Sequence, residues 1–211
     1  MAKPSPDKER QMLGLFLLPG VYLRVLADTV KRLGHDDRRL YEGLSFAPDE
    51  LQAADSRVFV TDAIIFADRA MAMAGKDGLS FLLARELRVT IHGTLGFAAL
   101  TSPTVGGALD SVRRYLQLRA PFLSLVMRDT GEHMLVQLRS EFEVPGLYHF
   151  LAETVMATLV MLAEQLVDRD SASELGFTLE NGKLPGVTAR LSCPEPAYYP
   201  RFAAQLPVSF E

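Results

Sequence analysis

The chain has 211 residues, of which 48% are hydrophobic, and 26 acidic against 22 basic residues give it a formal net charge of −4. This length allows one large domain or two small ones with a real core, and the hydrophobic content excludes wholesale disorder. Neutralising phosphates supplies most of a protein's affinity for DNA, so the acidic balance argues against a domain that binds DNA by itself.

The beginning of the chain predicts a flexible arm over residues 1–19, because its first stretch mixes Lys, Arg, Asp, Glu and Pro. The apolar run at residues 13–23 is interrupted by Gly14, Pro19 and Gly20, which excludes a membrane span. The mixed charges before that run exclude a signal peptide. Within the arm, residues 15–18 are expected to form an edge strand or an extended segment.

Helical periodicity with short connections predicts a small helical array over residues 20–92. The first helix has a continuous apolar face and ends at Gly34, a residue typical of helix C-termini. The predicted helices cover residues 20–34, 35–44, 48–51, 60–78 and 79–87.

The stretch at residues 93–118 begins with a short apolar segment that carries Gly96 and then breaks at Thr101. A helix is expected to follow the break. Ser102 is predicted to cap it and Pro103 to occupy its first position, where the missing N–H would be unpaired anyway. The apolar face of this helix consists of Val105, Ala108, Leu109, Val112 and Leu116.

After residue 120 the hydrophobic pattern changes to the period of strands. Residues 122–128 and 133–139 are rich in branched apolar side chains and flank Asp129-Thr130-Gly131-Glu132, which predicts a β-hairpin. Residues 147–167 follow as a long helix that is apolar almost all round, so it should be central and buried.

The last part of the chain predicts a second hairpin, in which residues 175–179 and 187–191 flank Asn181-Gly182. A short helix at 195–205 and a strand starting at Pro207 come next. Because the chain stops inside this apparent strand, we expect a partner segment or further chain beyond it. The elements together predict an α+β fold: an N-terminal helical array packed on a small, mostly antiparallel sheet, with a long central buried helix.

The sequence contains no pattern that carries catalysis or binds a cofactor, so we expect a protein that is not an enzyme. The four histidines stand far apart, and Cys193, the single cysteine, has no CxxC partner for a zinc site. Phosphate-binding glycine loops and a GxSxG elbow are also missing. The single cysteine further excludes a disulfide framework and is typical of a reducing cytosol.

Some polar or adaptable side chains in apolar surroundings are candidates for a ligand pocket between the central helix and the sheet. In such a pocket a few polar groups orient a ligand, and methionines adapt to its apolar part. The alternative for each is an ordinary core or boundary residue whose polar group has found a partner. The candidate ligand-binding residues are His92, Phe97, Tyr115, Met127, His149 and Met156.

A recurring set of motifs carries a resemblance to a known family. These motifs are Asp77-Gly78-Leu79, Gly93-Thr94-Leu95-Gly96, Leu100-Thr101-Ser102-Pro103-Thr104-Val105, Ala108-Leu109, Tyr115-Leu116 and the segments 189–198 and 207–210. They resemble the N-terminal sensing domain of AraC-family transcription regulators, in the arabinose-binding-domain-like subgroup that includes ornithine-utilisation regulators. The chain departs from the family pattern at Cys193, where such domains often carry a histidine. It also lacks the family's basic C-terminal domain with two helix-turn-helix units.

The resemblance implies that residues 20–211 form an effector-binding regulatory domain, with a helical part at 20–92 and an α+β part at 93–211. It implies a cytoplasmic bacterial regulator that binds a small-molecule effector, reaches DNA only through a separate C-terminal domain, contacts no membrane, and has a homodimer as an option. Two alternatives stay open: a stand-alone small-molecule sensor, including one that binds haem through His149 or His92, and a pure oligomerisation domain.

Overall fold

The computed structural model describes residues 12–131, 134–142, 147–166, 189–204, 206 and 208–210. The chain forms two compact units, and each is assembled from two separate stretches of sequence. Unit 1 comprises Met1–Leu79 and Arg113–Tyr148, and unit 2 comprises Ser80–Val112 and His149–Glu211. Of the predicted N-terminal arm, residues 1–11 lie outside the described residues.

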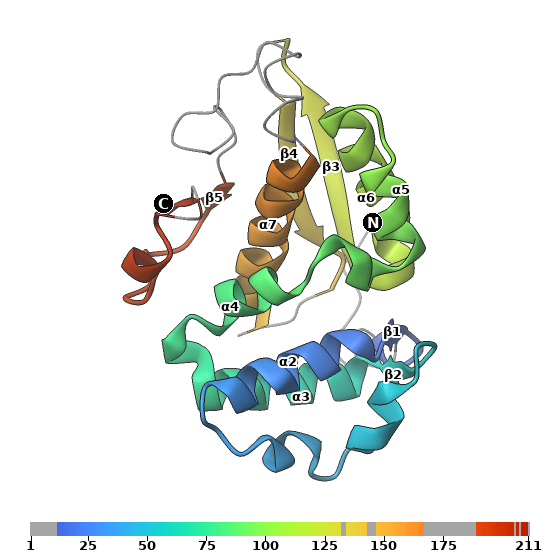
Figure 1. Cartoon of the computed structure of the whole chain (residues 1–211), viewed down its shortest axis with the longest axis vertical. Coiled ribbons are helices and arrows are strands. Elements are labelled where there is room, and N and C mark those ends of the chain that lie inside the picture. The colour runs from blue at the N-terminus through green and yellow to red at the C-terminus, as the bar shows by residue number, and fades with distance from the viewer. Residues whose placement is uncertain are drawn as a thin grey trace. The chain divides into compact units, whose positions relative to one another are not determined.

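Two helices, α2 (Val21–Arg32) and α3 (Val60–Ala74), form the centre of unit 1 and pack side by side (Figure 1). The apolar face of α2 is buried, as its periodicity predicts, with Val30 fully shielded from solvent. Gly34 then adopts a φ of 87°. This left-handed conformation ends the helix and costs a glycine little, because it has no Cβ.

Short elements connect these helices. Strand β1 (Leu17–Pro19) pairs antiparallel with β2 (Arg57–Phe59), and the sequence analysis did not predict β2. The helices η1 (Asp37–Tyr41) and η2 (Pro48–Gln52) confirm the short helical segments predicted there, in the tighter 3₁₀ form. Between α3 and the next helix, η3 (Gly75–Asp77) ends at Gly78, whose φ is 78°.

A β-hairpin, also in unit 1, confirms the strands predicted after residue 120. Strand β3 (Leu123–Asp129) pairs antiparallel with β4 (Met134–Ser140), and the buried Leu125 stands opposite the buried Leu138. Gly131 in the turn has a φ of 84°, and its N–H donates to Asp129 Oδ1 at 2.8 Å. The Asp-Thr-Gly sequence therefore forms the turn that its residue types favour.

The helices of the middle of the chain follow closely on one another. They are α4 (Leu79–Glu86), η4 (Val89–His92), α5 (Thr94–Leu100) and α6 (Val105–Arg119). The prediction that Ser102 caps α6 and that Pro103 is its first residue is wrong. Thr104 Oγ1 accepts the N–H of Gly107 at 3.0 Å, so Thr104 is the cap, whereas the Ser102 hydroxyl donates back to the carbonyl of Ala98 in α5 at 2.9 Å.

The long helix α7 (Leu147–Leu166) confirms the predicted central buried helix. Its burial extends over several faces and includes the polar residues Glu153 and Thr154, each 4% exposed. A charged residue on such a largely buried helix is removed from water, so it needs polar partners within the protein.

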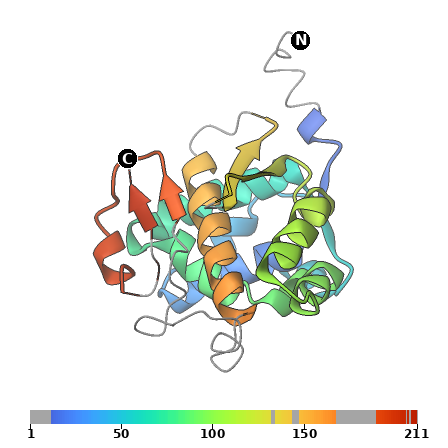
Figure 2. The ribbon, with the colours of Figure 1, turned by 90° about the horizontal axis from the view of Figure 1, so that it is seen from above.

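At the end of the chain, β5 (Ala189–Leu191) pairs in parallel with β6 (Val208–Phe210), and the two strands appear as adjacent arrows in Figure 2. The predicted strand at 175–179 and its Asn181-Gly182 turn lie outside the described residues. The helix predicted at 195–205 is only the 3₁₀ turn η5 (Tyr199–Arg201). A proline next to Tyr199 and another at residue 196 leave too little unbroken chain for a longer helix.

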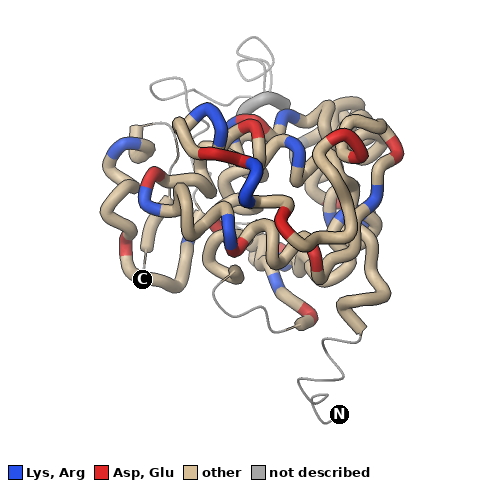
Figure 3. Tube along the Cα trace, turned by 90° about the horizontal axis from the view of Figure 1, so that it is seen from below, with Lys and Arg blue, Asp and Glu red and all other residues tan. Residues whose placement is uncertain are grey.

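The fold class is α+β, as the sequence predicts: within the described residues, helices dominate and the strands form two antiparallel pairs and one parallel pair. None of the helices in this described part combines the length and the apolar character that a membrane crossing requires. Acidic and basic residues are interspersed along the trace in Figure 3, and neither sign dominates the segments visible there.

Candidate functional site

The carboxylate of Glu153 is buried inside unit 2, where α4, α7 and the C-terminal segment contribute hydroxyl groups to it. Glu153 is 4% exposed and lies in the second turn of α7. The hydroxyl of Ser80, in the first turn of α4, donates to Glu153 Oε2. The Tyr198 hydroxyl lies 3.0 Å from Oε1 and 2.8 Å from Oε2. We call Ser80, Glu153 and Tyr198 the Glu153 cluster.

The backbone geometry of α4 and α7 holds two members of this cluster in place. Ser80 is 2% exposed, and its carbonyl accepts a hydrogen bond from Thr154 Oγ1 at 3.4 Å. Thr154 follows Glu153 directly, so adjacent residues of α7 contact the side chain and the backbone of the same serine. This double contact fixes where the Ser80 hydroxyl meets the carboxylate.

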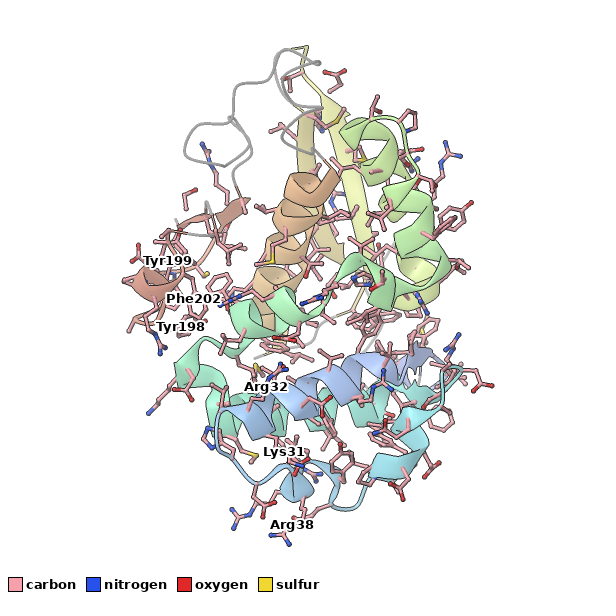
Figure 4. All side chains as sticks on the ribbon, viewed as in Figure 1. Lys31, Arg32, Arg38, Tyr198, Tyr199 and Phe202 are labelled. Carbon is pink, nitrogen blue, oxygen red and sulfur yellow. The ribbon has the colours of Figure 1, made fainter. Side chains whose placement is uncertain are left out.

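Aromatic packing places the third member. Phe81 follows Ser80 and is fully buried. Its ring centroid lies 6.0 Å from that of Tyr198, 5.9 Å from that of Tyr199 and 5.3 Å from that of Phe202. Figure 4 shows these three rings of the C-terminal segment close together. Such tilted and edge-on arrangements stabilise aromatic pairs beyond the burial of their area. The segment is therefore held against α4 by apolar contacts as well as by the Tyr198 hydroxyl.

Burial and the charge of Glu153 act on the neighbouring titratable groups. Burial raises the pKa of Tyr198 well above its usual range, and the hydrogen bond to Glu153 and the charge of that residue raise it further. Burial also raises the pKa of the Cys193 thiol, and the charge of Glu153 adds to that rise. Both groups are therefore neutral near pH 7.

Among the residues that the structure describes, the hydrogen-bond partners of Glu153 are hydroxyl groups, and no ion pair involves it. Buried charges in proteins are usually paired with an opposite charge or coordinate a metal. Within the same described residues, no group of three or more His, Cys, Asp or Glu side chains could hold a metal ion. The cluster is thus a buried acidic site without a cationic partner in the described chain.

Residues 34–191 match the family described as the arabinose-binding domain of AraC transcription regulators, at the N-terminus of those proteins. The chain belongs to this family. This result confirms the resemblance seen in the sequence motifs. The AraC-type domain is also 29% identical over 199 residues to the ornithine utilization regulator of Pseudomonas aeruginosa. That alignment covers 92% of this chain and 54% of the relative, so the chain spans about half of the relative's length.

The residues that the sequence analysis selected as ligand-binding are divided between the two units of this AraC-type domain. Tyr115 and Met127 belong to unit 1, and the other four belong to unit 2. In unit 2, His92 ends η4 and Phe97 lies in α5, two elements that pack against each other. Phe97 is 69% exposed.

On α7, two predicted residues lie on the same face as the Glu153 cluster. His149, Glu153 and Met156 occupy positions i, i+4 and i+7, which form one stripe along a helix. His149 is exposed, Met156 is half-buried and Glu153 is buried. Exposure along this stripe therefore falls from His149 to Glu153 and rises again at Met156.

The sequence analysis of this AraC-type domain missed all three members of the Glu153 cluster. One signal was present: Glu153 is the one acidic residue in the first half of an otherwise apolar helix. Such a residue is either exposed or paired in the interior. Its partners could not be identified from the sequence, because Ser80 and Tyr198 lie 73 and 45 positions away.

Proposed function

We propose that this chain is the effector-sensing regulatory domain of a cytoplasmic bacterial AraC-type transcription regulator. The observation that carries the proposal is the family match over residues 34–191, which takes in most of the described helices and strands. The relative is a regulator about twice as long as the aligned segment. DNA binding in this chain's protein would accordingly reside in a helix-turn-helix domain outside these residues, which agrees with the net charge of −4.

The domain would work by a population shift and not by catalysis. An effector that binds one arrangement of the domain more tightly than another favours that arrangement, and the attached DNA-binding domain is presented differently. Coupling energies of this kind are typically about 1–3 kcal/mol. A second copy of the chain is the further partner that we propose, since a dimer would present two DNA-binding domains to two half-sites.

We propose that the ligand-binding residues selected from the sequence line an effector pocket within the unit to which each belongs. In unit 2, His92 and His149 would supply polar contacts, Phe97 an aromatic contact and Met156 an adaptable apolar wall. In unit 1, Tyr115 and Met127 would supply the aromatic and apolar contacts. Replacing either histidine by alanine should weaken effector binding. A ligand-bound structure with the effector more than about 10 Å from all of these side chains would exclude this pocket.

A thermal-shift screen of the purified chain tests the proposed function. A ligand that binds only the folded state stabilises it, by about 2.7 kcal/mol at a concentration 100 times its Kd. Because the relative is named for ornithine utilization, amino acids are the first class to screen, followed by fatty acids and aromatic metabolites. We expect at least one class to raise the melting temperature. No shift with any of them would favour a pure oligomerisation domain, and a Soret band in the purified protein would favour a haem sensor.

A further inference from the structure

We infer that Glu153 binds a positively charged amino or guanidino group of the effector, with Ser80 and Tyr198 as its hydroxyl partners. This inference rests on the proposed sensing function and names the chemical class of the ligand. It adds to the pocket a recognition group that lies on the same stripe of α7 as His149 and Met156.

The buried carboxylate of Glu153 has no counter-charge among the described residues. Removing a carboxylate from water costs several kcal/mol even after the protein relaxes, and a nearby cation is the usual compensation. Glu153 is 4% exposed, and its partners among the described residues are two neutral hydroxyl groups. A cationic group of the ligand would supply the electrostatic attraction that these neutral hydroxyl groups do not.

The described donors around the carboxylate are fewer than its acceptor sites. An ionised carboxylate offers about four lone-pair sites, whereas each hydroxyl group has a single proton to donate. Ser80 donates to Oε2, and the one proton of Tyr198 is shared between Oε1 and Oε2. The carboxylate can therefore accept further donors, most readily on Oε1, and an ammonium or guanidinium group carries several.

The titratable neighbours Tyr198 and Cys193 leave the charge of Glu153 unopposed. His149 is exposed and stands one helical turn from Glu153 on the same face of α7. Tyr198 and Cys193 are half-buried, and both are neutral near pH 7 because burial and Glu153 raise the pKa of each. The carboxylate therefore acts without a competing charge from either neighbour.

The ligand class that fits is a small molecule with a terminal amine or guanidine, such as a basic amino acid or a diamine. We would measure binding to the full 211-residue chain by calorimetry, using L-ornithine, L-lysine and 1,4-diaminobutane as probes. L-Norvaline is the control for the terminal group, because it has the carbon skeleton and the α-amino group of ornithine but no side-chain amine. At least one cationic probe should bind, and L-norvaline should bind about tenfold or more weakly than L-ornithine.

The substitution that tests the charge is Glu153→Gln, which keeps the shape and one acceptor oxygen but removes the charge and replaces the other oxygen by an NH2 donor. It should weaken binding of the cationic probe by about tenfold or more. Glu195→Gln is the matched control, because Glu195 is exposed in the same unit and is not among the hydrogen-bond partners of Glu153; it should leave the affinity unchanged. Circular dichroism establishes that both variants are folded. If Glu153→Gln does not fold, Glu153→Asp takes its place, which keeps the charge, shortens its reach and should also weaken binding.

The outcomes separate this inference from the function on which it rests. Equal affinity of L-norvaline and L-ornithine, or unchanged binding of the cationic probe in the Glu153 variant, would overturn the inference while leaving a sensing domain intact. The same holds if only neutral or anionic compounds shift the melting temperature in the wider screen. If no compound of any class binds, the proposed sensing function itself fails.

Discussion

The hydroxyl of Tyr198 lies 2.8 Å from Oε2 and 3.0 Å from Oε1 of Glu153, a residue 45 positions earlier in the chain. This contact connects the C-terminal segment to α7 within unit 2. The same segment continues through Tyr199, whose hydroxyl accepts the N–H of Val208 at 3.2 Å and lies 2.9 Å from the carbonyl of Leu206. Hydrogen bonds of Tyr198 and Tyr199 therefore connect Glu153 with the segment that ends in β6.

Tyr198→Phe should destabilise the protein, because the ring packing remains while the buried carboxylate loses a donor. Hydrogen bonds to charged groups contribute about 1.5–3 kcal/mol, so a loss in this range is expected. Urea unfolding monitored by circular dichroism measures it.

A double-mutant cycle supplies the control for this contact. If Tyr198 and Glu153 interact, the free-energy changes of Tyr198→Phe and Glu153→Gln will not add in the combined variant. Additive changes would mean that the hydroxyl and the carboxylate contribute to stability independently of each other.

Cys193 should react slowly with thiol reagents, and Glu153→Gln should speed its reaction. The thiolate is the reactive form, and burial together with the charge of Glu153 raises the pKa of Cys193. Removing that charge lowers the pKa and increases the thiolate fraction at about pH 8. Labelling with an aromatic disulfide reagent measures the rate. Glu195→Gln is the control: although Glu195 is near in sequence, its charge is not among the causes of the shift, so the rate should stay the same.

Local sequence signals predicted most of the secondary structure of this domain, because turn and helix-end chemistry is set by a few adjacent residues. Gly34 and Gly131 stand where the chain adopts positive φ values of 87° and 84°. The position of the α6 cap was missed by two residues because Ser102 and Thr104 both have a hydroxyl that suits it. Thr104 caps the helix, because the hydroxyl of Ser102 instead hydrogen-bonds to the carbonyl of Ala98 in α5.

Features that depend on distant parts of the chain were not predictable in the same way. Strand β2 has only three residues, and it is stabilised by antiparallel pairing with β1, which lies about 40 positions earlier in the sequence. The parallel pairing of β5 with β6 likewise joins segments whose local patterns indicate strands but not partners. The Glu153 cluster is the clearest case, because its hydroxyl groups come from α4 and from the C-terminal segment.

The protein should lose stability as the pH rises from 10 to about 12, in part because of Tyr41. Burial, followed by the charges of Asp37 and Asp28, raises the pKa of Tyr41 from 10.0 to about 12. In this window the unfolded chain loses a proton that the folded chain keeps, so the unfolded state is favoured as pH increases. Urea unfolding across this range should show a shallower loss of stability for Tyr41→Phe than for the unchanged protein. A residual slope is expected, because the pKa values of Tyr22 and Tyr198 are also raised.

Gly96→Ala should destabilise the protein because α5 approaches η4 too closely for a side chain at this position. A Cβ at Gly96 would overlap the carbonyl group of Val89, which is backbone and cannot rotate away as a side chain would. Overpacking of this kind costs about 1–3 kcal/mol. Gly106→Ala in α6 is the matched control, since a Cβ there meets no atom within 4 Å. It should be neutral or stabilise the helix by up to about 1 kcal/mol. Equal unfolding free energies for the two alanine variants in urea would show that the close approach of α5 to η4 contributes nothing to the stability of the fold.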